Sequence, residues 1–508
     1  MKKEQLESRQ TRCYMDVFHF VNQVPPSGSG SGIFMNIIPS DVDNLKTEKY
    51  QLYDDIVSFS YSKSLSSPAG TFQCKILATR DYSKLISPGD WVQIYLTTSK
   101  DKKHKRVIGN VDRISLEEFI NEDGMREIYF SISGRDFGKI FQDTTIWFNP
   151  YTLDQYKAVI LNKINKPGGP PNVLIKNIID LFLNDAESVA DCSTSMNYWY
   201  IGDRFAQELG QSGHPQFADL IDMSDFSVEQ PGFKAIPVLN VQGNVWSVLK
   251  GISNEVINTM FTELYENKDT GELLPKLYFG VRPYCFRSFT SEIIPTIQYF
   301  LDLPSAVVDA KEIIGASIGL NDHDRLNMFF LRLQEQPYYK SQEAKVFYTQ
   351  GIDLDSIKRS GLRLFSRNID YGIIQGGTVD SELYSEYMRL VSTWYKANHL
   401  LENGTFTILG NPEIRVGRRL VINNSKMYPN RQYLIESYTD SWSFGDVWRQ
   451  QVEVTRGITL ENESEKYAYQ SQAGLFNVSQ VSKIDNRASK DLLPDTAYSS
   501  DAVKNVVI

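Results

Sequence analysis

Apolar and polar residues alternate along residues 50–138, and this pattern predicts β-strands. From residue 56 the alternation has period two and places Ile56 or Val57, together with Phe59 and Tyr61, on the faces of a sheet. Further alternating runs follow at the spacing of hairpins, at residues 72–80, 85–96, 107–119 and 126–136. These runs predict a small antiparallel β-barrel or sandwich.

The middle of the chain carries helical periodicity. In residues 172–186, apolar side chains recur at intervals of three and four after a proline-rich break at 167–171, which predicts an amphipathic helix. A second helix is predicted over 244–267, with Asn244 as its N-cap. Its apolar face would hold Trp246, Leu249, Ile252, Val256, Met260 and Leu264. Residues 190–240 are irregular, and strands are predicted at 273–284 and 326–333.

A third helix and a second β pattern complete the regular part of the chain. Residues 381–401 predict a long amphipathic helix that ends near Gly404. Alternating runs then return at 404–422, 431–444 and 447–458.

The second β pattern resembles the first. Residues 87–94 (SPGDWVQI) and 415–422 (RVGRRLVI) each contain a glycine, two further residues and then a β-rich run. Each ends about forty residues later at a Gly–Arg pair, Gly134–Arg135 in one and Arg456–Gly457 in the other. We infer an internal repeat of two related small β-barrels; the alternative is a chance similarity between β-meanders.

The two ends of the chain are predicted to be arms. Residues 24–32 (VPPSGSGSG) form a flexible linker, and residues 15–21 before it suit a short strand that pairs elsewhere. Residues 461–508 are polar and poor in periodicity, so they would become ordered only against a partner; a frayed terminus without a role is the alternative.

Composition excludes several classes of protein. The 508 residues suggest about three or four domains, and the net charge of −9 disfavours a protein that coats DNA. The longest apolar runs are too short to cross a bilayer, and no secretory signal begins the chain. The cysteines show no metal-binding spacing and are predicted to be unpaired, mostly buried thiols: Cys13, Cys74, Cys192 and Cys285.

No segment predicts an active site, so we expect no catalytic residue, no cofactor-binding residue and no metal ligand. The basic cluster at 99–106 suits a solvated hairpin tip better than a phosphate contact, and the pairs Glu117–Glu118 and Asp322–Asp324 suit surface charge. Residues 321–327 lack the glycine and glutamate of a calcium loop, and residues 375–377 (QGG) are a loop. The histidines stand in none of the known catalytic or metal motifs: His19, His104, His214, His323 and His399.

The order of these segments resembles a known family. A β domain with PGDWVQI and an SGRD end is followed by a proline-broken helix, a W-x2-L-x2-I helix and an LYFGVRP strand. A late helix then leads into the run G-x-P-x-(I/L)-x-x-G-x-x-(V/L)-x-(V/I) at 410–422. Residues 50–460 resemble the baseplate central hub of contractile-tailed phages, the late control protein D family, and are similar to the N-terminal half of the type VI secretion spike VgrG. Arg418 departs from the small or acidic residue usual in that run.

The resemblance implies an α+β, mainly β fold with two tail-tube-like small antiparallel β-barrels and helical or irregular insertions. The segments would be an N-terminal arm and linker (1–48), a first tube-like β-barrel domain (49–150), a helical or irregular insertion (151–243), an α+β domain (244–345), a second tube-like β-barrel domain with a long helix (346–460) and a C-terminal tail (461–508).

The resemblance also implies a structural role. Three chains with two barrels each would form a homotrimeric ring of pseudo-sixfold symmetry that joins a hexameric tail tube to a trimeric central spike. Further partners would be the tail tube initiator or tube protein, baseplate wedge components and, in the lumen, tape-measure protein or DNA. The chain would be a virion component of the tail baseplate, assembled in the cytoplasm of the bacterial host, and not an enzyme.

A second class of function stays open at this stage. A virion-associated or secreted protein that binds or cleaves carbohydrate can contain aromatic-rich β domains of this size. The aromatic run at 198–200 (YWY) would then form a sugar platform, although such a cluster is more often core or subunit contact.

Overall fold

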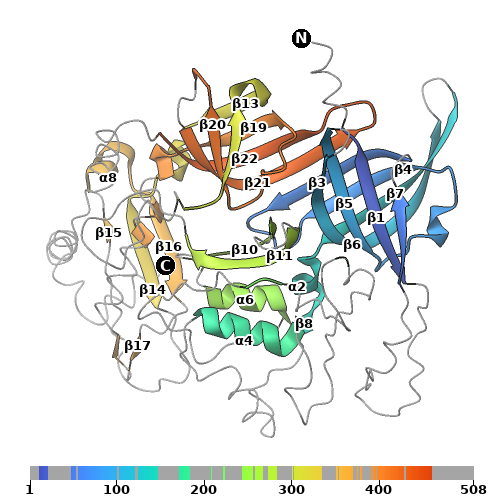
Figure 1. Ribbon diagram of the computed structural model, residues 1–508. Helices are drawn as coiled ribbons and strands as arrows, with labels where there is room; N and C mark the ends of the chain where they lie inside the picture. Colours follow the sequence, from blue (N-terminus) through green and yellow to red (C-terminus); the bar gives the residue numbers. More distant parts are fainter. Residues whose placement is uncertain are drawn as a thin grey trace, which may run out of the picture.

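The chain's structure, a computed structural model, describes residues 11–20, 47–52, 55–99, 102–120, 124–146, 171–183, 208, 221–223, 243–253, 255, 258–266, 273–282, 300, 302–333, 351–352, 354–369, 374–375, 378–379, 391–392, 394–395, 398–427 and 431–459. Strands dominate this part of the chain, which confirms the mainly β class (Figure 1). None of the helices in it is long and apolar enough to cross a membrane.

The largest sheet begins with strands from the first third of the chain. Its order is β3-β4-β7-β6-β5-β1-β2, and every neighbouring pair is antiparallel. The bounds in chain order are β1 (Cys13–Phe20), β2 (Thr47–Leu52), β3 (Ile56–Ser64), β4 (Thr71–Leu77), β5 (Trp91–Ser99), β6 (Lys102–Ile120) and β7 (Arg126–Asp136). Strand β1 confirms the predicted pairing of residues 15–21, because it lies between β2 and β5.

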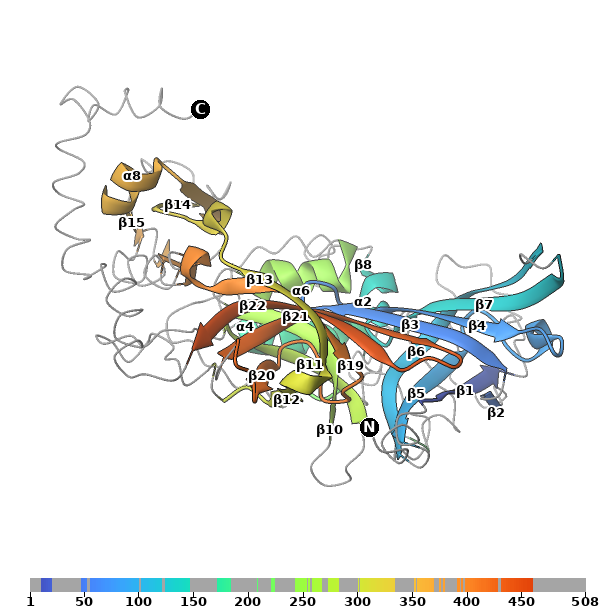
Figure 2. The same ribbon diagram turned by 90° about the horizontal axis from the view of Figure 1, so that it is seen from above.

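The same sheet continues with strands from the second half of the chain. Their order is β13-β19-β22-β21-β20-β12, antiparallel except for the parallel pair β20–β12. The bounds are β12 (Ser305–Asp309), β13 (Ile313–Gly319), β19 (Glu402–Leu409), β20 (Arg419–Asn423), β21 (Arg431–Ser443) and β22 (Arg449–Thr459). Because β21 also pairs with β3, both groups belong to one continuous sheet (Figure 2). Two closed barrels remain a prediction.

The two groups of strands repeat the same order. In the first group, the order of hydrogen-bonded neighbours is β3, β4, β7, β6, β5 and β1. In the second group, the strands in the same places are β13, β19, β22, β21, β20 and β12. We call them the first and the second repeat. The outer strands β1, β12 and β13 come from outside residues 49–150 and 346–460, so each repeat is larger than the sequence pattern alone indicated.

Two β-bulges also repeat at corresponding places. In β6 the register shifts between Val111 and Arg113, and in β21 it shifts between Ile435 and Ser437. In β3 it shifts between Ile56 and Ser58, and in β13 between Ile313 and Gly315. A bulge adds one residue to one strand, which explains why both Ile56 and Phe59, three positions apart, face the core.

The glycines that suggested the repeat hold the same backbone position. Gly89 donates its N–H to the Val111 carbonyl oxygen (2.8 Å), and Gly417 donates to that of Ile435 (3.0 Å). Both have a positive φ, +98° and +74°, which favours glycine. A side chain at Gly417 would also collide with the ring of Phe261.

The Gly–Arg ends of the two β patterns are not equivalent, contrary to the sequence alignment. Val111 lies opposite Gly134, and Ile435 lies opposite Val454. Gly134 therefore corresponds to Val454, and Gly457 lies three positions further along β22. Register, which is set by hydrogen bonds to the neighbouring strand, overrides the similarity of short sequence pairs.

The middle of the chain packs a helical layer beside a hairpin (Figure 1). Helices α2 (Lys139–Asp143), α4 (Pro171–Leu183) and α6 (Val245–Ser253) share an apolar core with the hairpin β10 (Asn258–Glu266) and β11 (Leu273–Val281). Helix α4 confirms the helix predicted at 172–186, and Asn244 caps α6 by accepting a hydrogen bond from the Ser247 N–H (2.7 Å).

The helix predicted over 244–267 is wrong beyond residue 253. Residues 258–266 form β10, which pairs with β11 along its whole length. Positions four apart share one face of a helix, but they also share one face of a strand, so Met260 and Leu264 fit either structure. Both are buried in the same core as α6, and the pairing with β11 decides the conformation.

The remaining elements are short. Strands β14 (Met328–Leu333), β15 (Gly351–Ile352) and β16 (Leu364–Ile369) form a small sheet beside α8 (Leu354–Ser360), and short pairs form between β8 (Thr145–Ile146) and β9 (Gly243–Asn244) and between β17 (Ile374–Gln375) and β18 (Thr378–Val379). Of the helix predicted at 381–401, residues 391–392 and 394–395 are helical. Gly404 does not end that helix: it lies inside β19, opposite Ile318 of β13 and Val454 of β22.

Candidate functional site at the junction of the two repeats

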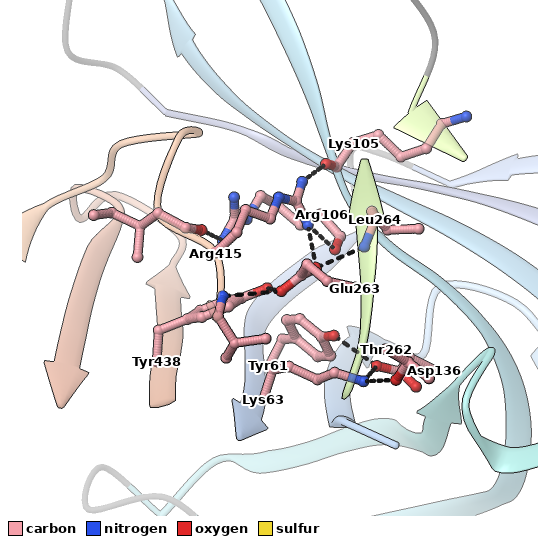
Figure 3. A network of polar contacts seen from close by, with 12 residues as sticks. Tyr61, Lys63, Lys105, Arg106, Asp136, Thr262, Glu263, Leu264, Arg415 and Tyr438 are labelled. Carbon is pink, nitrogen blue, oxygen red and sulfur yellow. Dashed lines mark hydrogen bonds and ion pairs between the residues drawn. The ribbon is translucent and has the colours of Figure 1, made fainter. Parts of the chain in front are cut away.

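The two repeats meet along a pair of strands and a buried network of charges. Ser437–Ser443 of β21 pair with Ser58–Ser64 of β3. Behind this pair lies a buried network of charged and polar side chains drawn from both repeats and from β10 (Figure 3). The apolar core is likewise continuous, since Phe59, Phe72, Phe406 and Val452 belong to one cluster.

Arg106 of β6 forms the first link. Its Nε donates to Asp440 Oδ2 of β21 at 2.8 Å, and both side chains are fully buried. Its Nη1 and Nη2 donate to the carbonyl oxygens of Pro412 (2.9 Å) and Ile414 (3.1 Å). One guanidinium of the first repeat thus holds three groups of the second.

The carboxylate of Asp440 is fully satisfied by donors. Besides Arg106, Trp448 Nε1 donates to Asp440 Oδ1 at 3.0 Å, and Gln450 Nε2 donates to the same oxygen at 2.7 Å. The Arg106 guanidinium also lies 5.2 Å from the Trp448 ring. The attraction within a buried ion pair offsets the cost of desolvation only when its remaining hydrogen-bonding groups are also paired. The Arg106–Asp440 pair meets this condition.

Arg415 forms a second link, in the opposite direction. It belongs to the second repeat, and its Nη2 donates to the Lys105 carbonyl oxygen of β6 at 2.8 Å. Its Nη1 donates to Glu263 Oε1 of β10 at 3.2 Å. Glu263 Oε2 accepts a hydrogen bond from the Val416 N–H (3.2 Å), so the hairpin β10–β11 is tied to the same junction.

Lys63 of β3 links the first repeat to β10. Its Nζ donates to Asp136 Oδ2 at 2.7 Å, to Thr262 Oγ1 at 2.8 Å and to the Pro68 carbonyl oxygen at 2.9 Å. Tyr61 donates to the same Asp136 oxygen at 2.8 Å. The ammonium group therefore reaches its full number of three acceptors while buried.

Burial and charge shift the pKa values of this network. Burial, assisted by the negative charge of Asp136, holds the pKa of Tyr61 well above its ordinary value, so the phenol stays protonated as a donor. Burial alone would lower the pKa of Arg415, but the nearby Tyr438 and Glu263 outweigh it and raise the pKa. Tyr61 therefore stays a donor and Arg415 keeps its positive charge, and the network can fix the orientation of the two repeats.

The basic cluster at 99–106 differs from its predicted form at one end. Lys102 and Lys103 are exposed on the β5–β6 hairpin, as expected of a solvated tip. Arg106, in contrast, is completely buried, where it pairs with Asp440. Asp440 lies 334 residues away in the sequence. Sequence patterning missed it, since nothing local distinguishes a paired buried arginine from a surface one.

The paired carboxylates are separated by the structure. Glu117 pairs with Lys75 (3.3 Å) and Glu118 with Arg126 (2.5 Å), on different neighbours. Asp322 pairs with Arg325 at 2.6 Å, whereas Asp324 accepts a hydrogen bond from Asn403 at 3.0 Å. Within the described residues, no group of three or more His, Cys, Asp and Glu side chains is placed to hold a metal ion.

Other sequence features fall partly outside the described residues. Cys13 and Cys74 are buried and unpaired, and burial raises the pKa of both thiols. Cys192, Cys285, the aromatic run at 198–200, the linker at 24–32 and the tail at 461–508 lie outside those residues. Gln375 pairs with Thr378, so the QGG segment at 375–377 runs from β17 into the connection to β18.

Comparison with known proteins found similarity among solved structures. No protein-family model and no curated protein matches the chain. A tail protein from Neisseria meningitidis is 10% identical with a TM-score of 0.41, and the match covers 80% of this chain and 93% of that one. The 43 kDa tail protein of prophage MuSo2 from Shewanella oneidensis is 12% identical with a TM-score of 0.43, covering 80% and 96%. A chain of the Francisella PdpA–VgrG complex is 9% identical with a TM-score of 0.40, covering 88% and 53%.

Proposed function

We propose that this chain is the structural hub of a contractile phage tail baseplate. Three copies form a ring of pseudo-sixfold symmetry that joins a hexameric tail tube to a trimeric central spike. The observation that carries the proposal is the internal repeat: six strands recur in the same order of neighbours, with bulges at the same two places. A ring of three subunits matches a ring of six when each subunit presents two similar faces.

The junction between the repeats supports the same role. A hub that transmits force needs its two halves held at a constant angle. The buried Arg106–Asp440 ion pair and the hydrogen bond from Arg415 to the Lys105 carbonyl oxygen join the two halves. In this proposal the chain acts without catalysis and resides in the virion tail. Its partners are further copies of itself, the central spike, the tube initiator or tube protein and the baseplate wedges, with tape-measure protein or DNA in the lumen.

Mass measurement tests the proposal directly. Sedimentation velocity of the purified chain at micromolar concentration should show a species of three times 58.1 kDa, and negative-stain images should show a ring with six similar densities. A chain that stays monomeric both alone and when mixed with spike and tube proteins contradicts the hub. Cleavage of murein or lipopolysaccharide by the purified chain would favour the glycan-cleaving class.

A further inference from the structure

The pairing of β21 with β3 within one chain shows how the strands of one repeat join those of the other. Strand β21 has β22 on one edge. On its other edge it carries β20 opposite residues 432–434 and, beyond the bulge, β3 opposite residues 437–443. The outer strand of the first repeat thus occupies the part of the β21 edge that the second repeat leaves open.

The first repeat leaves the corresponding part of its own edge open. Strand β6 has β7 on one edge, and β5 covers the other edge only up to Asn110. The last backbone hydrogen bonds on that edge of β6 are those of Gly89 and Asp90. The corresponding bonds on β21 are those of Gly417 and Arg418. Among the strands that the structure describes, none pairs with Arg113–Ile120 on this side.

The second repeat offers a matching outer strand. Strand β13 corresponds to β3 and pairs with β19 on one edge, as β3 pairs with β4. Its other edge, which corresponds to the edge of β3 that meets β21, has no partner strand in the described part of the sheet. A free edge of this kind exposes backbone N–H and C=O groups that can pair with another strand.

Both open edges carry exposed apolar side chains. Leu116 and Ile120 of β6 are 60% and 73% exposed, and Ile314 and Leu320 at β13 are 53% and 62% exposed. Two of the corresponding residues at the internal junction are covered: Asp440, where Leu116 stands in β6, is 0% exposed, and Lys63, where Leu320 stands, is 1% exposed, whereas Phe444, where Ile120 stands, is 77% exposed. Apolar side chains grouped on an unpaired edge indicate a surface that another chain covers.

We infer that residues 113–120 of β6 in one copy pair antiparallel with β13 of a second copy of this chain. Transferring the register of β21 on β3 places Leu116 opposite Ile318, Glu117 opposite Ser317 and Ile120 opposite Ile314. The inference deepens the proposed hub, on whose trimer it rests, by naming the strands and the register that join its subunits.

The geometry requires a second copy because the two edges cannot meet in one chain. Strand β13 ends the sheet on one side, and six strands separate it from β6 in the order of neighbours. The outer end of the β6–β7 hairpin lies far from β13 (Figures 1 and 2). A contact between two different surfaces of identical chains continues from copy to copy until it closes into a ring or forms a filament. The two junctions also differ in chemistry: Lys63 and Asp440 at the internal one are replaced by Leu320 and Leu116 at the other.

Disulfide cross-linking tests the proposed register between β6 of one copy and β13 of another. The chain with Glu117→Cys and Ser317→Cys should form intermolecular disulfides under mild oxidation, because directly opposed Cβ atoms lie about 4.5–5.5 Å apart. The matched control carries Ser115→Cys and Ser317→Cys, two positions out of register, where the separation is about 7–8 Å. Each single-cysteine chain and the unaltered chain measure background from the native thiols.

The cross-linked species separate the outcomes. Dimers and trimers from the first variant, at several times the yield of the control, support both the pairing and the trimeric ring. Longer ladders would support the pairing and contradict the trimer. A trimer by sedimentation with no cross-linking above background, or with equal cross-linking in both variants, overturns the pairing and leaves the hub standing. A chain that stays monomeric overturns both.

A pair of surface substitutions gives a second, independent readout. Leu116→Lys should raise the concentration at which the trimer dissociates at least tenfold, because it places a charge inside the proposed contact. Leu362→Lys is the matched control, since Leu362 is also 60% exposed but lies away from β6 and β13. Both variants should keep the melting temperature of the dissociated chain. Equal effects of the two substitutions on assembly would contradict the pairing.

Discussion

Removing the carboxylate of Asp440 should strongly destabilise the junction between the repeats. Asp440→Ala leaves the buried Arg106 guanidinium with only the carbonyl oxygens of Pro412 and Ile414, at 2.9 and 3.1 Å. It also leaves the donors of Trp448 and Gln450 without their acceptor. Breaking one side of a buried ion pair costs about 3–5 kcal/mol, and we expect a loss in that range.

Related variants separate charge from packing. Asp440→Asn keeps an oxygen for Trp448 and Gln450 but loses the charged bond to Arg106, so we expect a smaller loss, about 1.5–3 kcal/mol. The double change Arg106→Met with Asp440→Leu should recover part of the loss, because it removes both charges together. Leucine already occupies the corresponding position of the first repeat, Leu116.

Urea unfolding followed by tryptophan fluorescence measures these differences. Trp442 and Trp448 are buried at the junction and will report its opening, and a fixed protein concentration keeps any contribution of assembly constant. Arg449→Ala is the control, since its ion pair with Asp446 is about half exposed on both sides and should contribute less than about 1 kcal/mol. Equal losses of stability for Asp440→Ala and Arg449→Ala, or simple additivity of the effects of Arg106→Met and Asp440→Leu, would show that the buried ion pair does not stabilise the junction.

Three further predictions concern the core, a turn and pH. Ile94→Asp and Ile422→Asp each place an unpaired charge in a fully buried strand and should cost about 3 kcal/mol or more; a normal unfolding midpoint in either variant contradicts the strand assignment. Gly89→Ala should cost about 1–2 kcal/mol through its positive φ alone, whereas Gly417→Ala should cost more because an aromatic ring fills the space beside it; equal unfolding midpoints would refute the difference. Burial lowers the pKa of His104, so the folded state resists its protonation and the free energy of unfolding should fall as the pH drops below about 6.5. The variant His104→Gln should flatten this dependence between pH 7.5 and 5.5. An unchanged slope would exclude His104 as its source.

Local patterning predicted most of the strands and the helix α4. Period-two alternation identifies a strand because successive side chains point to opposite faces. The glycines Gly89 and Gly417 revealed the repeat, since their positive φ demands glycine wherever the same turn recurs. Alternation could not separate helix from strand at 258–266, where apolar residues spaced by four fit both periods.

The junction, in contrast, is decided by tertiary structure alone. Arg106 reads as the end of a basic surface cluster, and only the approach of β21, more than three hundred residues later, makes it a buried ion-pair partner. The bulges in β3 and β6 also escape the pattern, because register depends on the hydrogen bonds to neighbouring strands. Sequence therefore determined which residues form the strands and that they recur, while the continuity of the sheet and its open edges follow from contacts between segments distant in the chain.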